Sequence, residues 1–365
     1  MGKTKSSKKK STESVLHPFC NLPKVDRRPL PEGLNPIRER LIRVVEKKWA
    51  NGTQLRYYFF DRPTDGGGRW KGPKKQQDVV RKAFKAWKDL GIGLEFREVD
   101  TREEAEIRIG FDQRDGSWSY VGRDIIDFAG DPNERTMNFG WDLTTSYGWD
   151  TALHEIGHTL GFPHAHQNPF AGIDWDENAV YNYFSGPPNY WDRQTIDWNI
   201  LRKLSPQEVE GSDWDPNSIM QYAFPAGMIL HPEQYRNGLE PEPGLSQIDK
   251  DQVRLFYPPI EGNDVKKLLP YESQRLNIPA GAQLNFKIKP DYSREYVIQT
   301  FGWADTVMVL FESTEEGPRY IMGDDDSGTE RNAKIVCRLT RGREYVLRLR
   351  LYYSYIAGDC AVMMY

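Results

Sequence analysis

The run His154–His164 constrains this chain more than any other part of its sequence. It reads H-E-I-G-H-T-L-G-F-P-H, which is the pattern H-E-x-x-H-x-x-G-x-x-H. On a helix, residues four positions apart lie on one face, so His154 and His158 can present imidazole nitrogens to a single metal ion. Gly161 allows the sharp turn at which the helix ends, and His164 then returns as a third ligand.

This ligand set predicts a zinc site of the catalytic kind. Catalytic zinc has three protein ligands and keeps a fourth position for water or substrate. Glu155 lies beside the ligand face and can reach a water molecule at the metal without being a ligand, so we expect it to act as a general base. The alternative is an amphipathic helix whose histidines are buried by chance. The glycine and the third histidine in register argue against that alternative.

A second signal lies downstream, where Ser218–Tyr222 reads S-I-M-Q-Y. A lone methionine is usually core filler, but this one follows a complete zinc motif. The two segments together resemble the metzincin metalloproteases, close to the astacin-like branch, in which a tight turn carries a methionine beneath the zinc. Two positions depart from that pattern: Gln221 replaces a histidine of the turn, and Ala165 replaces the glutamate that tends to follow the third ligand.

The resemblance implies a zinc-dependent metalloendopeptidase and assigns roles to its residues. The three histidines hold the zinc, which polarises the scissile carbonyl and lowers the pKa of its water toward ~7. Glu155 takes the proton from that water and returns it to the leaving amine. Tyr222 matches the position whose phenol hydrogen-bonds the tetrahedral intermediate, and Met220 supplies an apolar floor. The expected partners are protein or peptide substrates.

Two rival functions remain open at this point. One is a catalytically idle binding module in which a C-terminal β-sandwich is the working part, and the presence of Glu155 argues against it. The other is a zinc hydrolase that acts on another class of substrate. The long histidine motif followed by the methionine turn argues against that second rival.

Composition and periodicity divide the chain into three parts. Residues 1–35 form a Lys- and Pro-rich arm that we expect to be disordered, and it is a candidate propeptide. Residues 36–258 are expected to form an α+β metzincin catalytic domain with a twisted mixed sheet, a zinc helix and a closing helix. After a linker, residues 266–365 alternate apolar and polar residues in short runs, which is typical of an all-β antiparallel sandwich.

The same patterns predict individual elements. In the catalytic domain they predict helices at 75–90, 149–160 and 245–257, strands at 53–60, 94–99 and 107–111, and an edge strand near 125–129. Ser246 is the expected N-cap of the closing helix. In the C-terminal domain they predict strands at 283–288, 295–300, 307–311, 335–339 and 345–351.

The C-terminal part resembles the pre-peptidase C-terminal domain appended to many secreted proteases. The stretches that carry this resemblance are Glu295–Ile298, Ala304–Thr306 and Asp324–Gly328. The acidic run Asp324–Asp326 could bind a calcium ion through clustered carboxylates. The alternative is a β-turn whose short acidic residues cap the backbone.

The chain has three cysteines. Cys337 and Cys360 fall in predicted strands, where they could form a disulfide in an oxidising compartment or be small buried hydrophobes. Cys20 lies in P-F-C-N-L-P, which is loosely similar to the cysteine switch of matrixin propeptides but lacks its Arg and Gly. Its thiolate could fill the open zinc position and keep the enzyme latent. The alternative is an idle thiol on the arm.

Charge and hydropathy exclude other classes of function. The formal net charge is −4, so no global basic field favours nucleic acid. No apolar run approaches the ~20 residues of a membrane helix. The first ten residues contain no apolar signal-peptide core, which predicts a cytoplasmic protein, whereas the resemblance implies an extracellular one. Gly2 and Ser6 fit a short N-myristoylation pattern, with a solvated tail as the alternative.

Overall fold

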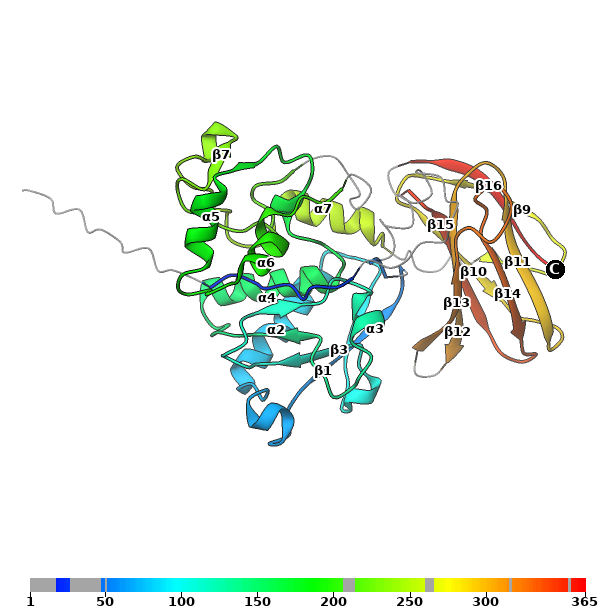
Figure 1. The fold of residues 1–365 in the computed structure, drawn as a ribbon. Coiled ribbons are helices and arrows are strands. Elements are labelled where there is room, and N and C mark those ends of the chain that lie inside the picture. The colour runs from blue at the N-terminus through cyan, green and yellow to red at the C-terminus, as the bar shows by residue number, and fades with distance from the viewer. Residues whose placement is uncertain are drawn as a thin grey trace, which may run out of the picture.

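The computed structural model describes residues 18–26, 47–49, 51–205, 214–259, 266–314, 317–353 and 356–365. Figure 1 shows an α/β lobe followed by an all-β lobe. Each lobe has its own apolar core, one built around Trp87 and Ile156 and the other around Phe286 and Leu347. The predicted α+β class with a C-terminal β-sandwich is therefore confirmed.

A five-stranded sheet forms one half of the α/β lobe, in the order β2-β1-β3-β5-β4. Its strands are β1 (Gln54–Phe59), β2 (Glu95–Glu98), β3 (Ile107–Gly110), β4 (Trp118–Ser119) and β5 (Met137–Asn138). The paired strands run parallel except β4, which is antiparallel to β5 and lies at the edge of the sheet. The sheet has both parallel and antiparallel strand pairs, so the predicted mixed sheet is confirmed.

Helix α2 (Lys74–Lys88) connects β1 to β2 and covers the sheet. Its buried residues recur at the predicted helical spacing, which gives the helix one apolar face. They are Val80, Ala83, Phe84 and Trp87. Phe84 stacks on Tyr57 of β1 at a centroid distance of 4.5 Å. Trp87 Nε1 donates to Leu153 O at 3.1 Å, so α2 also fixes the helix of the zinc motif.

The zinc-motif helix is α4 (Ser146–Thr159), and the other half of the lobe follows it along the chain. In Figure 1, α4 lies between the sheet and helices α5 and α6. The remaining elements are α5 (Glu177–Phe184), α6 (Arg193–Ile196), a π-helical turn (Asp197–Leu201), the paired strands β6 (Asp174–Trp175) and β7 (Ile229–His231), α7 (Gln247–Phe256), and short 3-10 turns at Asp65–Gly68, Arg102–Glu104, Ala165–Gln167 and Glu233–Tyr235. Ser246 caps α7 as predicted.

The prediction of an edge strand near 125–129 is wrong. This segment is helix α3 (Asp124–Phe128), and the edge strand is β4. Ile125 and Ala129, four residues apart, are buried, whereas Ile126 and Phe128 between them are exposed. That spacing fits one turn of helix and not the alternation of a strand.

The C-terminal lobe consists of two packed sheets, in the orders β13-β12-β15-β10-β8 and β14-β11-β16-β9. Apart from the short parallel pair β10–β8, the paired strands are antiparallel. The strands are β8 (Lys266–Lys267), β9 (Gln274–Ile278), β10 (Gln283–Ile288), β11 (Arg294–Phe301), β12 (Thr306–Thr314), β13 (Gly317–Asp324), β14 (Lys334–Leu339), β15 (Tyr345–Leu351) and β16 (Gly358–Met364). Alternating residues face the core between the sheets, which is why the pattern was readable from sequence.

The disulfide considered between Cys337 and Cys360 does not form, and both thiols are free. Cys337 lies on β14 and Cys360 on β16, and β11 runs between these two strands. Two strand spacings amount to roughly 9–10 Å, which is more than a disulfide can span. The alternative of small, partly or fully buried thiols is the one observed.

The acidic run of the C-terminal lobe caps a turn. The Asp324 carboxylate accepts hydrogen bonds from the Ser327 and Lys334 backbone amides at 3.0 and 2.6 Å. The cluster that could hold a metal ion among the described residues includes none of Asp324–Asp326. The expected calcium ion therefore finds no support, and the turn-capping alternative accounts for Asp324.

Part of the predicted disordered arm is an extended segment in contact with the α/β lobe. It covers residues 18–26, whereas residues 1–17 and 27–35 lie outside the described residues. In Figure 1 this dark blue segment runs along α4. Asn21 N donates to Ser117 O at 3.0 Å, and Leu22 N donates to Asn199 Oδ1 at 2.9 Å. None of the helices in the described part of the chain has the length and apolarity needed to cross a membrane.

One contact joins the two lobes through a cationic side chain. Arg348 of β15 donates from Nη1 to Asn51 O at 2.9 Å. The φ of Gly52 is +85°, which favours glycine, and an added Cβ there would lie 1.3 Å from the same Nη1. The contact lies outside both apolar cores.

We therefore expect a chain ending at Pro258 to fold alone, because its core is separate and every candidate site residue precedes the linker. It should melt cooperatively, and loss of the Arg348 hydrogen bond should cost about 1–2 kcal/mol of stability. The full-length Arg348→Ala protein is the matched control and should show a similar loss by chemical denaturation. A truncated chain without a cooperative transition would show that the lobes need each other to fold.

Candidate metal site and active-site cleft

Helix α4 carries the first two histidines of the motif and is fixed at both ends. The Thr145 side chain accepts a hydrogen bond from a backbone amide of the first turn, which is a typical N-cap. Trp49 Nε1 donates to Thr159 O at 2.7 Å near the other end. An added Cβ at Gly157 would lie 2.4 Å from Met220 Sδ. Glycine is therefore required for the methionine turn to approach the helix this closely.

The chain reverses at Gly161, whose φ of +98° lies in the region that favours glycine. This reversal brings His164 back toward the helix. His158 Nε2 lies 3.0 Å from His154 Nε2 and 3.2 Å from His164 Nε2. The structure thus brings the three predicted ligands together at one point.

Two backbone carbonyls determine which ring nitrogens face this point. His154 Nδ1 lies 2.7 Å from Ile219 O, and His158 Nδ1 lies 2.7 Å from Phe162 O. A carbonyl only accepts, so each Nδ1 carries the proton and each Nε2 presents a lone pair. Burial lowers the pKa of His154 to about 4 and holds the pKa of His158 well below its usual range. Both rings are therefore neutral, as metal ligands must be.

Neutral imidazoles in this arrangement fit a zinc ion. The Nε2 atom of His158 lies 3.0 and 3.2 Å from the Nε2 atoms of the other two rings, and lone pairs on nitrogens this close repel each other unless a cation lies between them. Zn–N bonds of about 2.0–2.1 Å in a tetrahedral site separate the ligand nitrogens by roughly 3.3 Å. The observed spacing is close to that value.

Cys20 adds a sulfur donor to the same point. Its Sγ and one nitrogen from each of the three histidines all lie within 4.8 Å of one another. Burial, followed by the charge of Glu155, raises the pKa of the Cys20 thiol. A thiolate here needs a cation beside it, which the neutral rings do not provide. One sulfur and three nitrogens are a donor set that zinc accepts readily.

Glu155 is fully buried next to the ligand cluster. Its Oε2 accepts a hydrogen bond from Cys20 Sγ at 3.5 Å, and its Oε1 has no hydrogen-bond partner among the described residues. Burial raises the pKa of the carboxyl to about 8. A carboxyl with a raised pKa and an unpartnered oxygen in a cleft is a candidate for proton transfer.

Tyr222 and Met220 both lie close to the histidine motif. The Tyr222 ring centroid lies 4.3 Å from that of His164, and its hydroxyl donates to Cys20 O at 2.7 Å. Met220 lies beneath the helix against Gly157, as described above. Gln221, which departs from the family pattern, accepts a hydrogen bond from Trp214 Nε1 at 2.9 Å and so anchors the turn.

Sequence reasoning missed the residue that holds the methionine turn. The Asp249 carboxylate accepts from Ser218 Oγ at 2.6 Å and from Ile219 N at 2.7 Å. The same carboxylate completes the capping box of α7 with Ser246. The S-x-x-D spacing at the start of α7 was the available signal. Only the folded chain shows that this cap also supports the turn whose Ile219 carbonyl orients His154.

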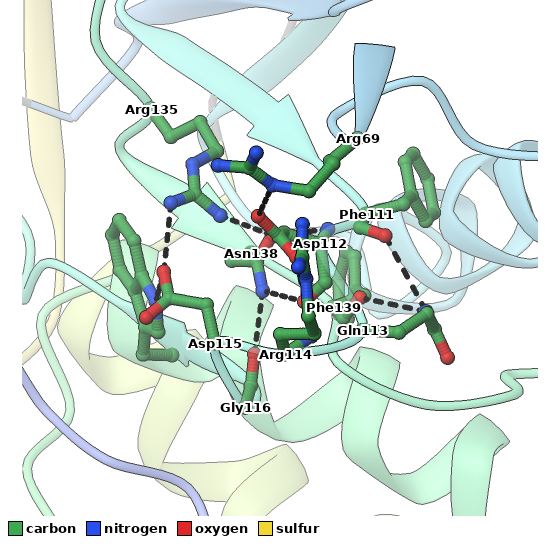
Figure 2. A network of polar contacts seen from close by, with 11 residues as sticks. Arg69, Phe111, Asp112, Gln113, Arg114, Asp115, Gly116, Arg135, Asn138 and Phe139 are labelled. Carbon is green, nitrogen blue, oxygen red and sulfur yellow. Dashed lines mark hydrogen bonds and ion pairs between the residues drawn. The ribbon is translucent and has the colours of Figure 1, made fainter. Parts of the chain in front are cut away.

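Trp118 of β4 lines a cavity next to residues 21–24, and a polar network fixes the loop before that strand (Figure 2). Asn138 Nδ2 donates to Asp112 O at 2.9 Å, while Asp112 pairs with Arg69 at 3.0 Å. Arg135 pairs with Asp115 at 2.7 Å and also donates to Asn138 Oδ1. Because these bonds involve both backbone and side chains, the loop holds the edge strand in a defined position.

Comparison with known proteins identifies the family. The model of the astacin peptidase family matches residues 43–228, which include the histidine motif and the methionine turn. The chain belongs to the astacin family. Astacin proteins are zinc metalloproteases, so the predicted resemblance is confirmed for this part of the chain.

Individual relatives agree with that assignment. The chain is 31% identical to bone morphogenetic protein 1 of Xenopus laevis over 195 residues, which are 50% of this chain and 24% of the relative. It is 26% identical to karilysin of Tannerella forsythia over 212 residues, 47% of this chain and 41% of that one. The solved structure of myroilysin is 31% identical with a TM-score of 0.51, and the match covers 59% of this chain and 97% of that chain. The chain spans less than a quarter of the length of the first curated relatives.

We expect His158→Ala to abolish zinc binding, because it removes the central ligand of the cluster. Elemental analysis of the purified protein should give about one zinc per parent chain and almost none for the variant. His166→Asn is the matched control, since His166 is equally buried but bonds Asn199 O and lies outside the ligand cluster. Normal zinc content in His158→Ala would contradict the ligand assignment.

Proposed function

We propose that this protein is a zinc-dependent metalloendopeptidase that hydrolyses peptide bonds in protein or peptide substrates. The observation that carries the proposal is the convergence of three neutral imidazole nitrogens beside a buried carboxyl with an unpartnered oxygen. When bound by His154, His158 and His164, zinc would polarise the scissile carbonyl and lower the pKa of a water ligand.

The side chains of the cleft would then move the proton and stabilise charge. Glu155 would accept a proton from the attacking water and deliver it to the leaving amine. The Tyr222 hydroxyl, which here donates to a backbone carbonyl, would donate to the oxyanion that develops on the scissile carbonyl oxygen. Met220 would support the ligand helix from below without taking part in the chemistry.

We further propose that Cys20 keeps the enzyme latent. Support comes from its sulfur, which lies within 4.8 Å of the three ligand nitrogens, and from the hydrogen bond that Asn21 N donates to Ser117 O beside β4. A thiolate ligand there would exclude both water and substrate. Release of the segment by proteolysis would expose the site. Residues 1–35 would then be a propeptide, residues 36–258 the catalytic domain and residues 266–365 a separate β-sandwich domain.

The compartment is proposed by analogy with the relatives. The pre-peptidase resemblance of the β-sandwich and the family of the catalytic domain both point to an extracellular protease. A disulfide would have supported that location, but Cys337 and Cys360 are free thiols.

Glu155→Gln keeps the size of the side chain but removes its ability to accept a proton. We expect a loss of activity on casein on the order of 10²–10⁴, while zinc content stays near that of the parent. Glu233→Gln, at an exposed position of the same lobe, is the matched control and should keep full activity. A zinc-loaded Glu155→Gln protein with substantial activity would refute the general-base role.

Latency through Cys20 predicts a different pair of results. The Cys20→Ala protein should be active as purified, whereas the parent should show a lag that proteolysis or a thiol-modifying mercurial removes. Cys20 should resist alkylation until zinc is chelated. Cys337→Ala is the control, because that thiol lies in the other lobe. Equal activity of the parent and the Cys20→Ala protein, with free alkylation of Cys20, would rule latency out.

A further inference from the structure

The residue before Cys20 fills an aromatic subsite. The Phe19 ring centroid lies 4.9 Å from that of Phe184, 5.1 Å from Tyr222, 6.2 Å from Tyr183 and 6.4 Å from Phe224. Three of these contacts are edge-to-face, the geometry that aromatic pairs prefer. We call the space bounded by these four rings the Phe19 subsite.

The Phe19 subsite lies directly beside the reaction centre. Phe19 is joined by one peptide bond to Cys20, whose sulfur lies within 4.8 Å of the ligand nitrogens. Tyr222, which forms one wall of the subsite, also contacts the His164 ring at 4.3 Å. A side chain in this subsite therefore belongs to a residue that flanks the position of the metal.

The cleft holds this segment by its main chain, as it would hold any peptide. Phe19 N donates to Asn189 Oδ1 at 3.0 Å, and Asn21 N donates to Ser117 O at 3.0 Å. Between them, the Cys20 carbonyl accepts from the Tyr222 hydroxyl. These bonds do not depend on which side chains the peptide carries. Selection between peptides must therefore come from the spaces that receive side chains.

We propose that the Phe19 subsite selects substrates, so that the enzyme cleaves next to a bulky aromatic or large apolar residue and rejects an acidic one there. The inference rests on the proposed peptidase function and adds the class of substrate to it.

The chemistry of the walls gives the reason. Phe184 and Phe224 are 0% and 2% exposed, so a side chain that enters is removed from water on these sides. An aromatic ring gains buried area and ring contacts. A carboxylate would lose its hydration, and none of the four rings that bound the subsite carries a positive charge to offset that loss. The nearby guanidinium of Arg193, on α6, lies over the ring of Tyr181 and not over Tyr183 or Phe184, which bound the subsite.

On the other side of Cys20, we expect weaker selection between the side chains of a bound peptide. Residues 21–24 border a cavity of about 400 Å³ that has polar and aromatic walls, including Asp192, Thr195 and Trp198. A space of this size and mixed polarity accepts many side chains. The strictest selection is therefore expected at the Phe19 subsite.

The first test profiles cleavage sites with the full-length Phe19→Ala/Cys20→Ala protein. In this variant neither the Phe19 ring nor the Cys20 thiol occupies the cleft. It is incubated with a peptide library, and the products are identified by mass spectrometry. We expect Phe, Tyr, Trp, Leu or Met at one fixed position flanking the cleaved bond. For matched peptides, kcat/KM with Phe there should exceed kcat/KM with Ala or Asp by roughly 10- to 100-fold. Absence of this enrichment, or enrichment of acidic residues, would overturn the inference.

A wall substitution tests the assignment of the subsite. Tyr183→Arg, made in the same background, should lower the preference for Phe over Asp at least about 10-fold. Asn182→Arg adds the same charge at the neighbouring exposed position of α5 and should leave the preference unchanged. An unchanged preference in a folded Tyr183→Arg protein would remove Tyr183 from the subsite and contradict the inference.

A third measurement needs no catalysis and so separates the inference from the proposed function. Alkylation of Cys20 is followed in full-length zinc-loaded proteins that differ only at residue 19. Phe19→Asp should speed alkylation at least about 10-fold because the carboxylate is excluded from the subsite, whereas Phe19→Tyr should change it little. Equal rates would overturn the inference even if casein is cleaved. Lack of casein cleavage by the Cys20→Ala protein would instead refute the proposed function.

Discussion

Three neutral imidazole nitrogens held face to face inside the protein are the arrangement on which the rest of the α/β lobe depends. The lone pairs of these nitrogens repel one another unless a cation lies between them, so the surrounding fold must hold the rings in place. The Ile219 carbonyl holds His154 and the Phe162 carbonyl holds His158. One carbonyl comes from the methionine turn and the other from the reversal after α4. Both segments must therefore be placed to within hydrogen-bond distance for the ligand set to exist.

Each support in turn depends on a more distant element. Asp249 of α7 holds the methionine turn, and Trp87 of α2 holds the middle of α4. These two residues lie on opposite sides of the motif in the sequence. The close approach of Met220 to Gly157 leaves no room for a side chain between the turn and the helix. The fold thus surrounds the site with rigid elements, which is how a metal site gains a defined geometry.

The departures from the astacin pattern are accommodated locally. Gln221, in place of a histidine, still anchors the turn through Trp214. Ala165 lacks the expected carboxylate, but its backbone amide donates to Met220 O at 2.9 Å and keeps the third-ligand loop against the turn. The N-terminal segment lies in the same cleft, where it contacts the aromatic walls and the ligand cluster. The same cleft therefore holds an extended segment of the chain next to the ligand cluster.

The sequence by itself determined the three converging histidines, the helix that carries two of them, the methionine turn and most strands of the sandwich, because these depend on spacing and periodicity within short segments. It did not determine the edge strand, since α3 is a short helix whose buried residues are too few to read. Tertiary structure alone decided that Cys337 and Cys360 are separated by a strand, that Asp249 supports the turn, and that Phe19 and Cys20 lie in the cleft. Contacts such as Cys20 with Glu155 join residues 135 positions apart, and no local pattern encodes which distant surfaces will meet.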